Sequence, residues 1–222
     1  MRKTTLPIVA AVAFAASPAF AQEDPTCRNG LFADDAPFAL AKVRGEGRAY
    51  YQADINGCPW NEGTCQAPAY LVPGDEVVLS KIRKGFACAY FPNDEGGTAG
   101  WISTRRLSLQ FVDNRPDEAA WLGAWQGSGA NPSIRFYKDT GKLHVVGEAF
   151  WPGPQGTHDY PTIHIGEVDG AVSLAGHTGT YSDENDCRVS FTLLSDYLVA
   201  SDNRRCGGVN VTFSGVYRRD RD

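Results

Sequence analysis

Short runs in which apolar and polar residues alternate recur along the chain and predict strands instead of helices. The clearest case is 187–194, where Val189, Phe191 and Leu193 would all face one side of a strand. The expected strands are 76–82, 85–91 and 99–109 in the first half, and 133–137, 142–150, 162–168, 171–176, 187–194, 197–201 and 209–218 in the second. Glycine, proline and aspartate separate these runs, so the sequence predicts an all-β protein.

The composition changes at 112–121 (VDNRPDEAAW), a charged segment that contains a proline and shows no strand pattern. We therefore expect a linker there between two compact parts. The predicted organisation is a first part at 22–112, a linker at 113–120, a second part at 121–219 and a charged tail at 220–222. Seven or eight strands with short connections in the second part are typical of an antiparallel barrel or sandwich.

Two turns are expected in the second part. Asp169-Gly170 suits a two-residue hairpin turn, and the segment 139–141 (DTG) suits a three-residue one.

The chain begins with the pattern of an export signal. Arg2 and Lys3 precede a short apolar run, and 19–21 (AFA) gives the small-x-small pattern of a cleavage site. We expect a signal peptide at 1–21 and a periplasmic or secreted protein. No cysteine lies at the cleavage point and the apolar run is too short for an anchor, so neither a lipid anchor nor membrane insertion is expected.

The charge balance is acidic. The net charge of −5 becomes −7 once Arg2 and Lys3 leave with the signal peptide. Phosphate backbones and anionic lipids attract basic surfaces, so the sequence predicts neither a nucleic-acid partner nor a membrane-surface partner.

Six cysteines follow the signal peptide, which in an exported chain predicts a disulfide framework. Their order along the chain favours three pairs: Cys58 with Cys65, Cys27 with Cys88, and Cys187 with Cys206. The connectivity among the first four stays open, whereas the last two lie far from the others.

Cys206 also invites a catalytic reading, because two arginines precede it and two glycines follow it. Cationic neighbours lower the pKa of a thiol, and glycines would allow a substrate to approach. In an oxidising compartment with Cys187 available, we expect a disulfide instead of a nucleophile.

No other catalytic pattern is convincing. The histidines at 144, 158, 164 and 177 match no zinc-binding spacing, and the serine in 126–131 lacks the setting of a hydrolase nucleophile. Glu148, Asp159 and Asp183 could in principle act as paired carboxylates, but surface positions are the expected outcome. The prediction is a protein with no catalytic residues, no metal and no cofactor.

Aromatic residues are the candidates for ligand binding, because a ring offers contact area at low entropic cost. The candidates are Tyr50, Tyr51, Trp60 and Tyr90 in the first part, and Trp151, His158 and Tyr160 in the second. Trp60, inside the expected Cys58–Cys65 loop, is the favoured exposed ring. The alternative for each is a place in the core, which is the expectation for Trp101.

The first part resembles bacterial SH3-like domains over about 38–110. The resemblance rests on Tyr50-Tyr51, 74–77 (GDEV), 85–90 (GFACAY), 100–102 (GWI) and Leu107, in that order. The insertion 56–68 replaces the usual first loop, and polyproline binding is not expected. The resemblance implies an SH3-like barrel that recognises peptidoglycan or another cell-wall polymer or peptide.

The second part is similar to a small β domain of unknown function in exported proteobacterial proteins, where it accompanies SH3-like or lysozyme-inhibitor-like modules. The similar residues are 121–125 (WLGAW), Cys187-Arg188 and 202–219. The alternative function is therefore a periplasmic protein inhibitor, which would insert the segment 150–161 into an enzyme such as lysozyme. An envelope protein then replaces the cell-wall polymer as the expected partner.

Overall fold

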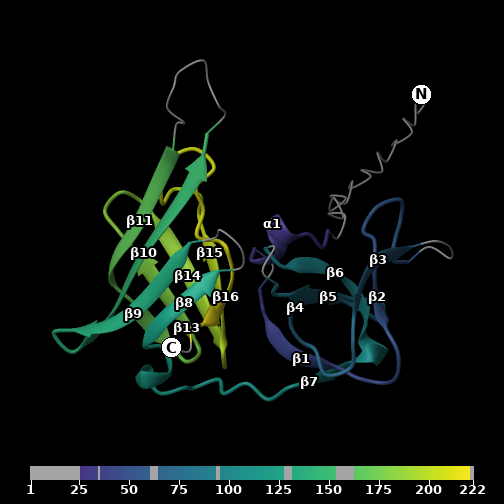
Figure 1. The fold of residues 1–222 in the computed structure, drawn as a ribbon. Coiled ribbons are helices and arrows are strands. Elements are labelled where there is room, and N and C mark those ends of the chain that lie inside the picture. The colour runs from purple at the N-terminus through teal and green to yellow at the C-terminus, as the bar shows by residue number, and fades with distance from the viewer. Residues whose placement is uncertain are drawn as a thin grey trace, which may run out of the picture.

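The computed structural model describes residues 26–34, 36–60, 65–93, 96–127, 132–153 and 163–220. The described chain is all-β, as predicted, and forms two antiparallel sheets with almost no helix. Figure 1 shows the two sheets side by side, with the short helix α1 (Asn29–Phe32) between them. None of the described helices has the length and apolar character needed to cross a membrane.

The first sheet has seven strands in the order β3-β2-β6-β5-β4-β1-β7. Their bounds are β1 Ala39–Val43, β2 Ala49–Gln52, β3 Gln66–Leu71, β4 Glu76–Arg83, β5 Phe86–Phe91, β6 Thr98–Ser103 and β7 Leu107–Leu109, with a 3-10 turn η1 at Thr104–Arg106. The sequence patterns located β4 and β5, joined β6 and β7 into one strand at 99–109 that η1 in fact interrupts, and missed the first three strands. These are short, and β3 contains Pro68, which is tolerated because β3 is an edge strand.

The second sheet is a nearly closed nine-stranded barrel in the order β11-β10-β9-β8-β16-β15-β14-β13-β12. Its strands are β8 Gly123–Gly127, β9 Ser133–Asp139, β10 Lys142–Pro152, β11 Ile163–Ala171, β12 Ser173–Ala175, β13 Thr178–Ser182, β14 Arg188–Leu194, β15 Tyr197–Asp202 and β16 Gly215–Arg219; a 3-10 turn η2 covers Glu118–Ala120. Successive strands are paired except β11 and β12, which form the two edges of the sheet, and the last strand, β16, pairs with the first, β8.

Both turn predictions need correction. Asp169 and Gly170 lie inside β11, where they pair with Val146 and Val145 of the long strand β10. The turn between β9 and β10 has two residues instead of three, because Asp139 pairs with Lys142. Thr140 and Gly141 both have positive φ, the conformation that a tight hairpin of this kind requires.

Aromatic side chains fill the barrel. Trp121, Trp125, Phe136, Phe191 and Phe213 are all almost completely buried in one apolar cluster. The Trp125 Nε1–H donates to the Trp121 carbonyl at 3.0 Å. The interior is therefore a packed core.

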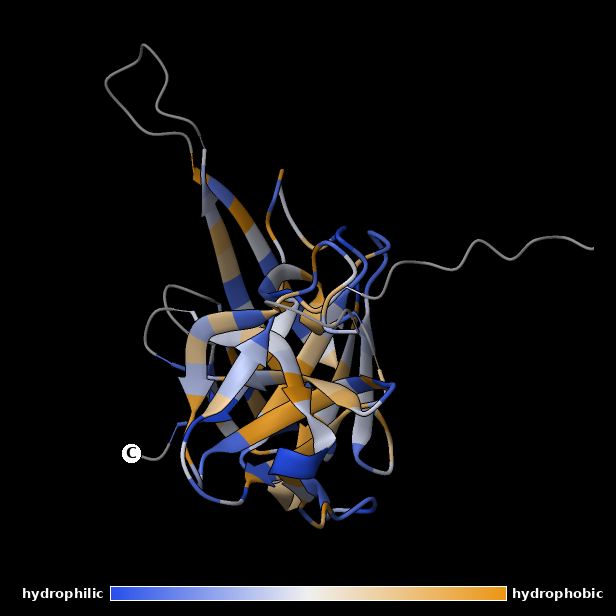
Figure 2. Cartoon of the chain, turned by 90° about the vertical axis from the view of Figure 1, so that its right-hand side faces the viewer, coloured by the Kyte–Doolittle hydropathy of each residue, from blue (hydrophilic) through white to orange (hydrophobic). Residues whose placement is uncertain are grey.

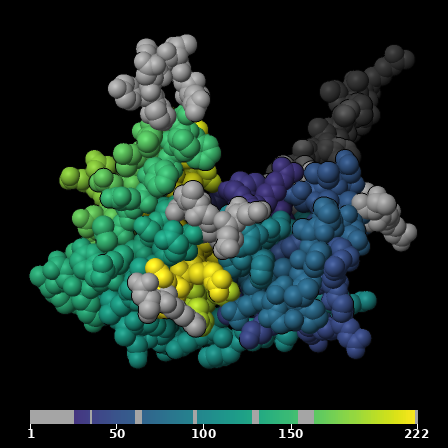
Figure 3. Space-filling view, viewed as in Figure 1, coloured from purple at the N-terminus to yellow at the C-terminus, as the bar shows by residue number. Residues whose placement is uncertain are grey.

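A separate apolar core joins the two sheets. From the first sheet it contains Val78, Tyr90 and Trp101, and from the barrel it contains the outward side chains Tyr197 and Val199. Figure 3 shows the N-terminal segment, in purple, between the blue sheet and the green and yellow barrel. The segment 113–120 is thus not the only connection between the two parts.

The three disulfides match the pairing that chain order favours. Cys27 bonds to Cys88, Cys58 to Cys65, and Cys187 to Cys206. The first of them ties the N-terminal segment to β5 at the shared core, because Cys27 and Cys88 both belong to that cluster.

The shared core predicts that the two sheets unfold together. Wild-type protein is expected to give a single calorimetric transition, because exposing the junction leaves apolar surface on both sheets. Val199→Asp places a charge in this core and should divide the transition into two. Thr180→Asp, at an exposed position of β13, is the control and should leave one transition. Two transitions in the wild-type protein would contradict the prediction.

Candidate functional site

Two of the predicted ligand-binding rings lie in the core. Tyr51 is buried against Gly100, and its hydroxyl donates to the Thr98 carbonyl at 3.3 Å. Tyr90 is buried in the shared core, where its hydroxyl donates to the Gly96 carbonyl at 3.0 Å. Neither ring face is free to stack on a ligand.

Trp60 is half-buried instead of protruding. Its ring packs edge-on against the buried Trp101, with 5.5 Å between ring centroids. The Lys84 ammonium lies 5.6 Å from the centroid of the Trp60 ring. Trp60 is thus mainly a packing residue, whereas Trp101 is in the core as expected.

Tyr50 is half-buried and lies next to the edge of the first sheet. It pairs across the strands with Tyr70 of the edge strand β3, and the two rings meet edge to face at 5.7 Å. Tyr70 is 43% exposed, and the Arg48 guanidinium lies 4.2 Å from its ring centroid. Arg48 also hydrogen-bonds to Tyr50, which raises the pKa of the guanidinium. We call Arg48, Tyr50 and Tyr70 the tyrosine platform.

The loop that carries Arg48 is fixed from below by Arg106. Its guanidinium donates to four backbone carbonyls of the loop 44–48, at 2.9 to 3.1 Å. The Arg44 amide in turn donates to the Arg106 carbonyl at 2.8 Å. Because these bonds involve the backbone of the loop, the position of Arg48 is set before any ligand arrives.

The hairpin of β10 and β11 is the second candidate surface. It rises above the rest of the molecule and carries apolar segments toward its tip (Figure 2). Phe150 stands opposite Ile165, and Ile163 follows on the same face; all three are more than half exposed. We call these three residues the hairpin face. The next pair on this face is Glu148 opposite Glu167.

Trp151 is 47% exposed and pairs with His164 on the opposite face of the hairpin. The other two predicted residues, His158 and Tyr160, lie outside the described residues. The structure therefore places one predicted ring, Trp151, at the hairpin, but on the side away from the hairpin face.

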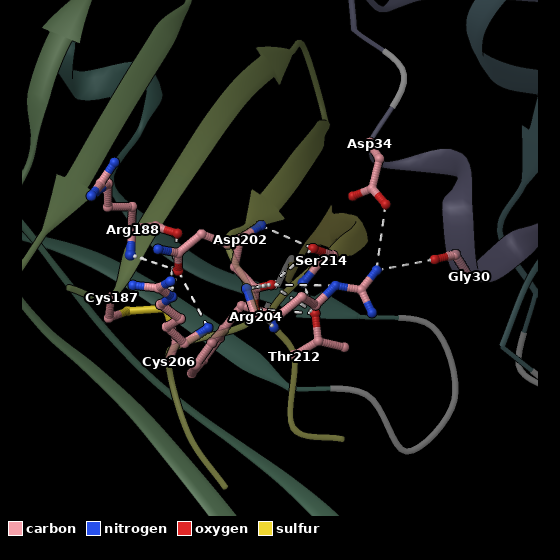
Figure 4. Close-up of polar contacts among 12 residues, drawn as sticks. Gly30, Asp34, Cys187, Arg188, Asp202, Arg204, Cys206, Thr212 and Ser214 are labelled. Atoms are coloured by element: carbon pink, nitrogen blue, oxygen red, sulfur yellow. Dashed lines mark hydrogen bonds and ion pairs between the residues drawn. A yellow bond between two sulfur atoms is a disulfide. The ribbon is translucent and has the colours of Figure 1, made fainter. Parts of the chain in front are cut away.

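A buried carboxylate organises the chain between β15 and β16 (Figure 4). The Asp202 side chain is fully buried. It accepts hydrogen bonds from the Phe213 amide at 2.5 Å and from the Thr212 hydroxyl at 3.1 Å. It also accepts from the Ser214 hydroxyl at 3.3 Å and from the Arg204 amide at 3.0 Å. These bonds replace strand pairing at 209–214, which explains why that part of the predicted strand 209–218 is absent.

Arg204 extends from this network to the N-terminal segment. Its guanidinium donates to the Gly30 carbonyl at 3.5 Å and lies 3.4 Å from an Asp34 oxygen. Arg204, the first of the two arginines before Cys206, thus connects the barrel to α1 and the residues that follow it (Figure 4). Asp202 was not a sequence-predicted site residue, and its role here is structural.

The glycines after Cys206 allow two backbones to approach closely. A Cβ on Gly166 would lie 2.3 Å from the Cys206 carbonyl oxygen, and one on Gly207 would lie 2.6 Å from the Gly166 Cα. Gly166 and Gly207 form an isolated bridge that covers part of the barrel seam next to β11. Cys206 is disulfide-bonded and almost completely buried, so its surroundings serve packing.

The buried tyrosines predict a loss of stability in alkali. Burial raises the pKa of Tyr51 and that of Tyr217, so both stay neutral in the folded state at a pH where the unfolded chain ionises. The contribution of these two groups to the free energy of unfolding should therefore stay constant up to about pH 10. Above that pH it should fall by up to about 1.4 kcal/mol per pH unit for each group. Denaturation of wild type and Tyr51→Phe at pH 8 to 11.5 tests this. If the free energy of unfolding falls equally steeply with pH in both proteins, Tyr51 does not contribute to the loss.

Among the described residues, no group of three or more histidine, cysteine, aspartate or glutamate side chains is placed so that it could hold a metal ion. Comparison of the chain with family models, curated proteins and solved structures finds no match.

Proposed function

We propose that the protein is an extracytoplasmic binding protein that recognises a cell-wall or other envelope glycan through the tyrosine platform. The observation that carries the proposal is the preordered cluster of Arg48, Tyr50 and Tyr70 on the outer edge of the first sheet. The three disulfides support an oxidising compartment.

The chemistry of the platform suits sugars. Aromatic faces cover the apolar C–H side of a sugar ring, and a neighbouring guanidinium donates hydrogen bonds to hydroxyl or carboxylate oxygens. Because Arg106 holds the loop in place, little conformational entropy is lost on binding. The edge position of β3 leaves the platform open along one side.

Co-sedimentation of the mature protein with purified cell-wall sacculi tests the proposal. We expect wild type in the pellet and the double variant Tyr50→Ala/Tyr70→Ala in the supernatant. Tyr137→Ala removes a half-buried tyrosine from the barrel and serves as the matched control, with binding retained. Wild-type protein recovered wholly in the supernatant at both low and high salt would remove the proposal.

A second candidate function, docking onto an envelope protein, is favoured by the hairpin face. Contiguous exposed apolar side chains mark interaction surfaces, and Phe150, Ile163 and Ile165 form such a group. The adjacent Glu148–Glu167 pair places like charges opposite each other, which a basic partner would compensate. The second candidate is thus inhibition of a basic enzyme such as a lysozyme.

This second candidate predicts inhibition that depends on the hairpin face. Wild type at micromolar concentration is expected to inhibit at least one member of a lysozyme panel, and Phe150→Ser/Ile165→Ser should weaken inhibition by about tenfold or more because hot-spot side chains are lost. Phe111→Ser removes a 90% exposed apolar ring elsewhere and should change nothing. No inhibition of any member would count against this function.

A further inference from the structure

Cations gather around the tyrosine platform although the chain as a whole is acidic. Three connected segments of the first sheet, the loop 44–48, the turn 83–85 and η1, hold six arginines and lysines against one glutamate. The six are Arg44, Arg48, Arg83, Lys84, Arg105 and Arg106, and we call them the basic rim. All are exposed except Arg106, which is half-buried.

Hydrogen bonds hold the three segments together at one end of the sheet. The Thr104 amide of η1 donates to the Gly85 carbonyl at 2.9 Å. Two residues further on, Arg106 binds the loop 44–48 as described above, and the Arg44 Nε–H donates to the Arg105 carbonyl at 3.1 Å. Segments that are far apart in sequence thus bring their cations into one neighbourhood of the first sheet.

The acids next to the rim are mostly occupied. The Glu76 carboxylate lies 3.8 Å from the Lys42 ammonium. The Asp75 carboxylate accepts the Val72 amide at 2.8 Å. Glu46 is the one acid within the three segments; its backbone carbonyl accepts from Arg106, and its carboxylate offsets only one of the six cations. The rim therefore keeps a positive excess that the net charge of the chain conceals.

We infer that the glycan bound by the platform is polyanionic and carries carboxylate or phosphate groups. The inference rests on the proposed function: the tyrosines bind the sugar rings, and the basic rim binds the acidic substituents. Arg48 belongs to both, because its guanidinium lies over the Tyr70 ring; a sugar bound against the platform therefore has its acidic group within reach of that guanidinium. Planar guanidinium groups pair with such oxygens in bidentate geometry. The sequence-based exclusion of anionic partners followed from net charge, which does not report where the charges lie.

Binding of the mature protein to immobilised polygalacturonate, compared with its methyl-esterified form, tests the inference. The two polymers share a backbone and differ in charge. We expect affinity for the acid form to fall at least about fivefold in Arg44→Gln/Arg105→Gln, since each exposed charge contact contributes modestly, and to weaken with added salt. Arg135→Gln/Lys142→Gln removes two exposed cations from the barrel and should have no such effect.

The other outcomes distinguish failure of the polyanion assignment from failure of glycan binding itself. Equal binding of both polymers, unchanged in Arg44→Gln/Arg105→Gln, would overturn the polyanion assignment and leave glycan binding standing. Binding of neither polymer, together with failure to sediment with sacculi, would remove both. Duplex DNA or phosphatidylglycerol vesicles bound as tightly as polygalacturonate, with no loss in Tyr50→Ala/Tyr70→Ala, would show a general anion surface and overturn the glycan assignment.

Discussion

Asp202→Ala is expected to destabilise the native state by about 2 to 4 kcal/mol, because it leaves several buried hydrogen-bond donors without their acceptor. The Asp202 carboxylate receives hydrogen bonds from two backbone amides and two hydroxyls. With the acceptor gone, the buried Phe213 amide has no replacement, and the chain between β15 and β16 loses the anchor that substitutes for strand pairing. Urea denaturation followed by tryptophan fluorescence measures the change.

Two further variants make this prediction specific. Asp202→Asn keeps the shape but turns a donating amide toward groups that also donate, so a smaller but still large loss is expected. Glu184→Ala removes an exposed carboxylate of the same barrel and should change the free energy of unfolding by less than about 0.5 kcal/mol. If Asp202→Ala shifts the urea midpoint no more than Glu184→Ala does, the carboxylate is not the organiser of this segment.

Gly166→Ala is expected to cost about 3 kcal/mol, at the upper end of overpacking effects. The added methyl carbon would lie 2.3 Å from the Cys206 carbonyl oxygen, and a backbone atom cannot rotate away as a side chain can. Gly207→Ala meets the same contact from the other side, at 2.6 Å from the Gly166 Cα. Both variants should separate β11 from the segment after the disulfide, and thermal denaturation should show similar losses for each.

Gly30→Ala is the control for these glycine variants. A Cβ there has no neighbour within 4 Å, and the residue lies in the short helix α1. Alanine is a better helix residue than glycine, so no loss of stability is expected. If Gly166→Ala and Gly207→Ala lose no more thermal stability than Gly30→Ala, the backbone at this contact can shift to accept a methyl group.

Alternation and cysteine order predicted much of the fold. The all-β class, most of the longer strands and the three disulfide pairs follow from patterns that the structure confirms. Cys206 shows the strength of this approach, because compartment and chain order favoured a disulfide over a nucleophile. The strands follow from alternation among residues close in sequence, whereas the Cys27–Cys88 pair, 61 residues apart, was favoured by the order of the cysteines.

The shared core was not predicted, although the sequence contains a signal for it. The patterns 76–82, 85–91 and 197–201 are nearly continuous apolar runs, and such strands are buried on both faces. Tyr197 and Val199 belong to these runs and face the first sheet. The charged linker at 112–121 indicated two separate parts. Burial of these strands on both faces indicates instead that the two parts pack against each other.

The candidate site was predicted only in part. Tyr50 was among the expected rings, but Tyr70 and Arg48 were missed because no strand was expected at Gln66–Leu71 to bring them beside it. Tyr51 follows Tyr50 directly and faces the opposite side of the strand, into the core, so register decides which ring can meet a ligand. The role of Arg106 depends on carbonyls about 60 residues away in sequence and has no local signal.

The place of β16 between β8 and β15 has a consequence for biogenesis. The barrel cannot be completed until the last strand, Gly215–Arg219, has been synthesised. Until then the outward apolar surface of β4 and β5 has no covering and stays prone to aggregation. Both sheets therefore depend on the final described strand for their burial, so the folded state cannot form in steps that follow the order of synthesis.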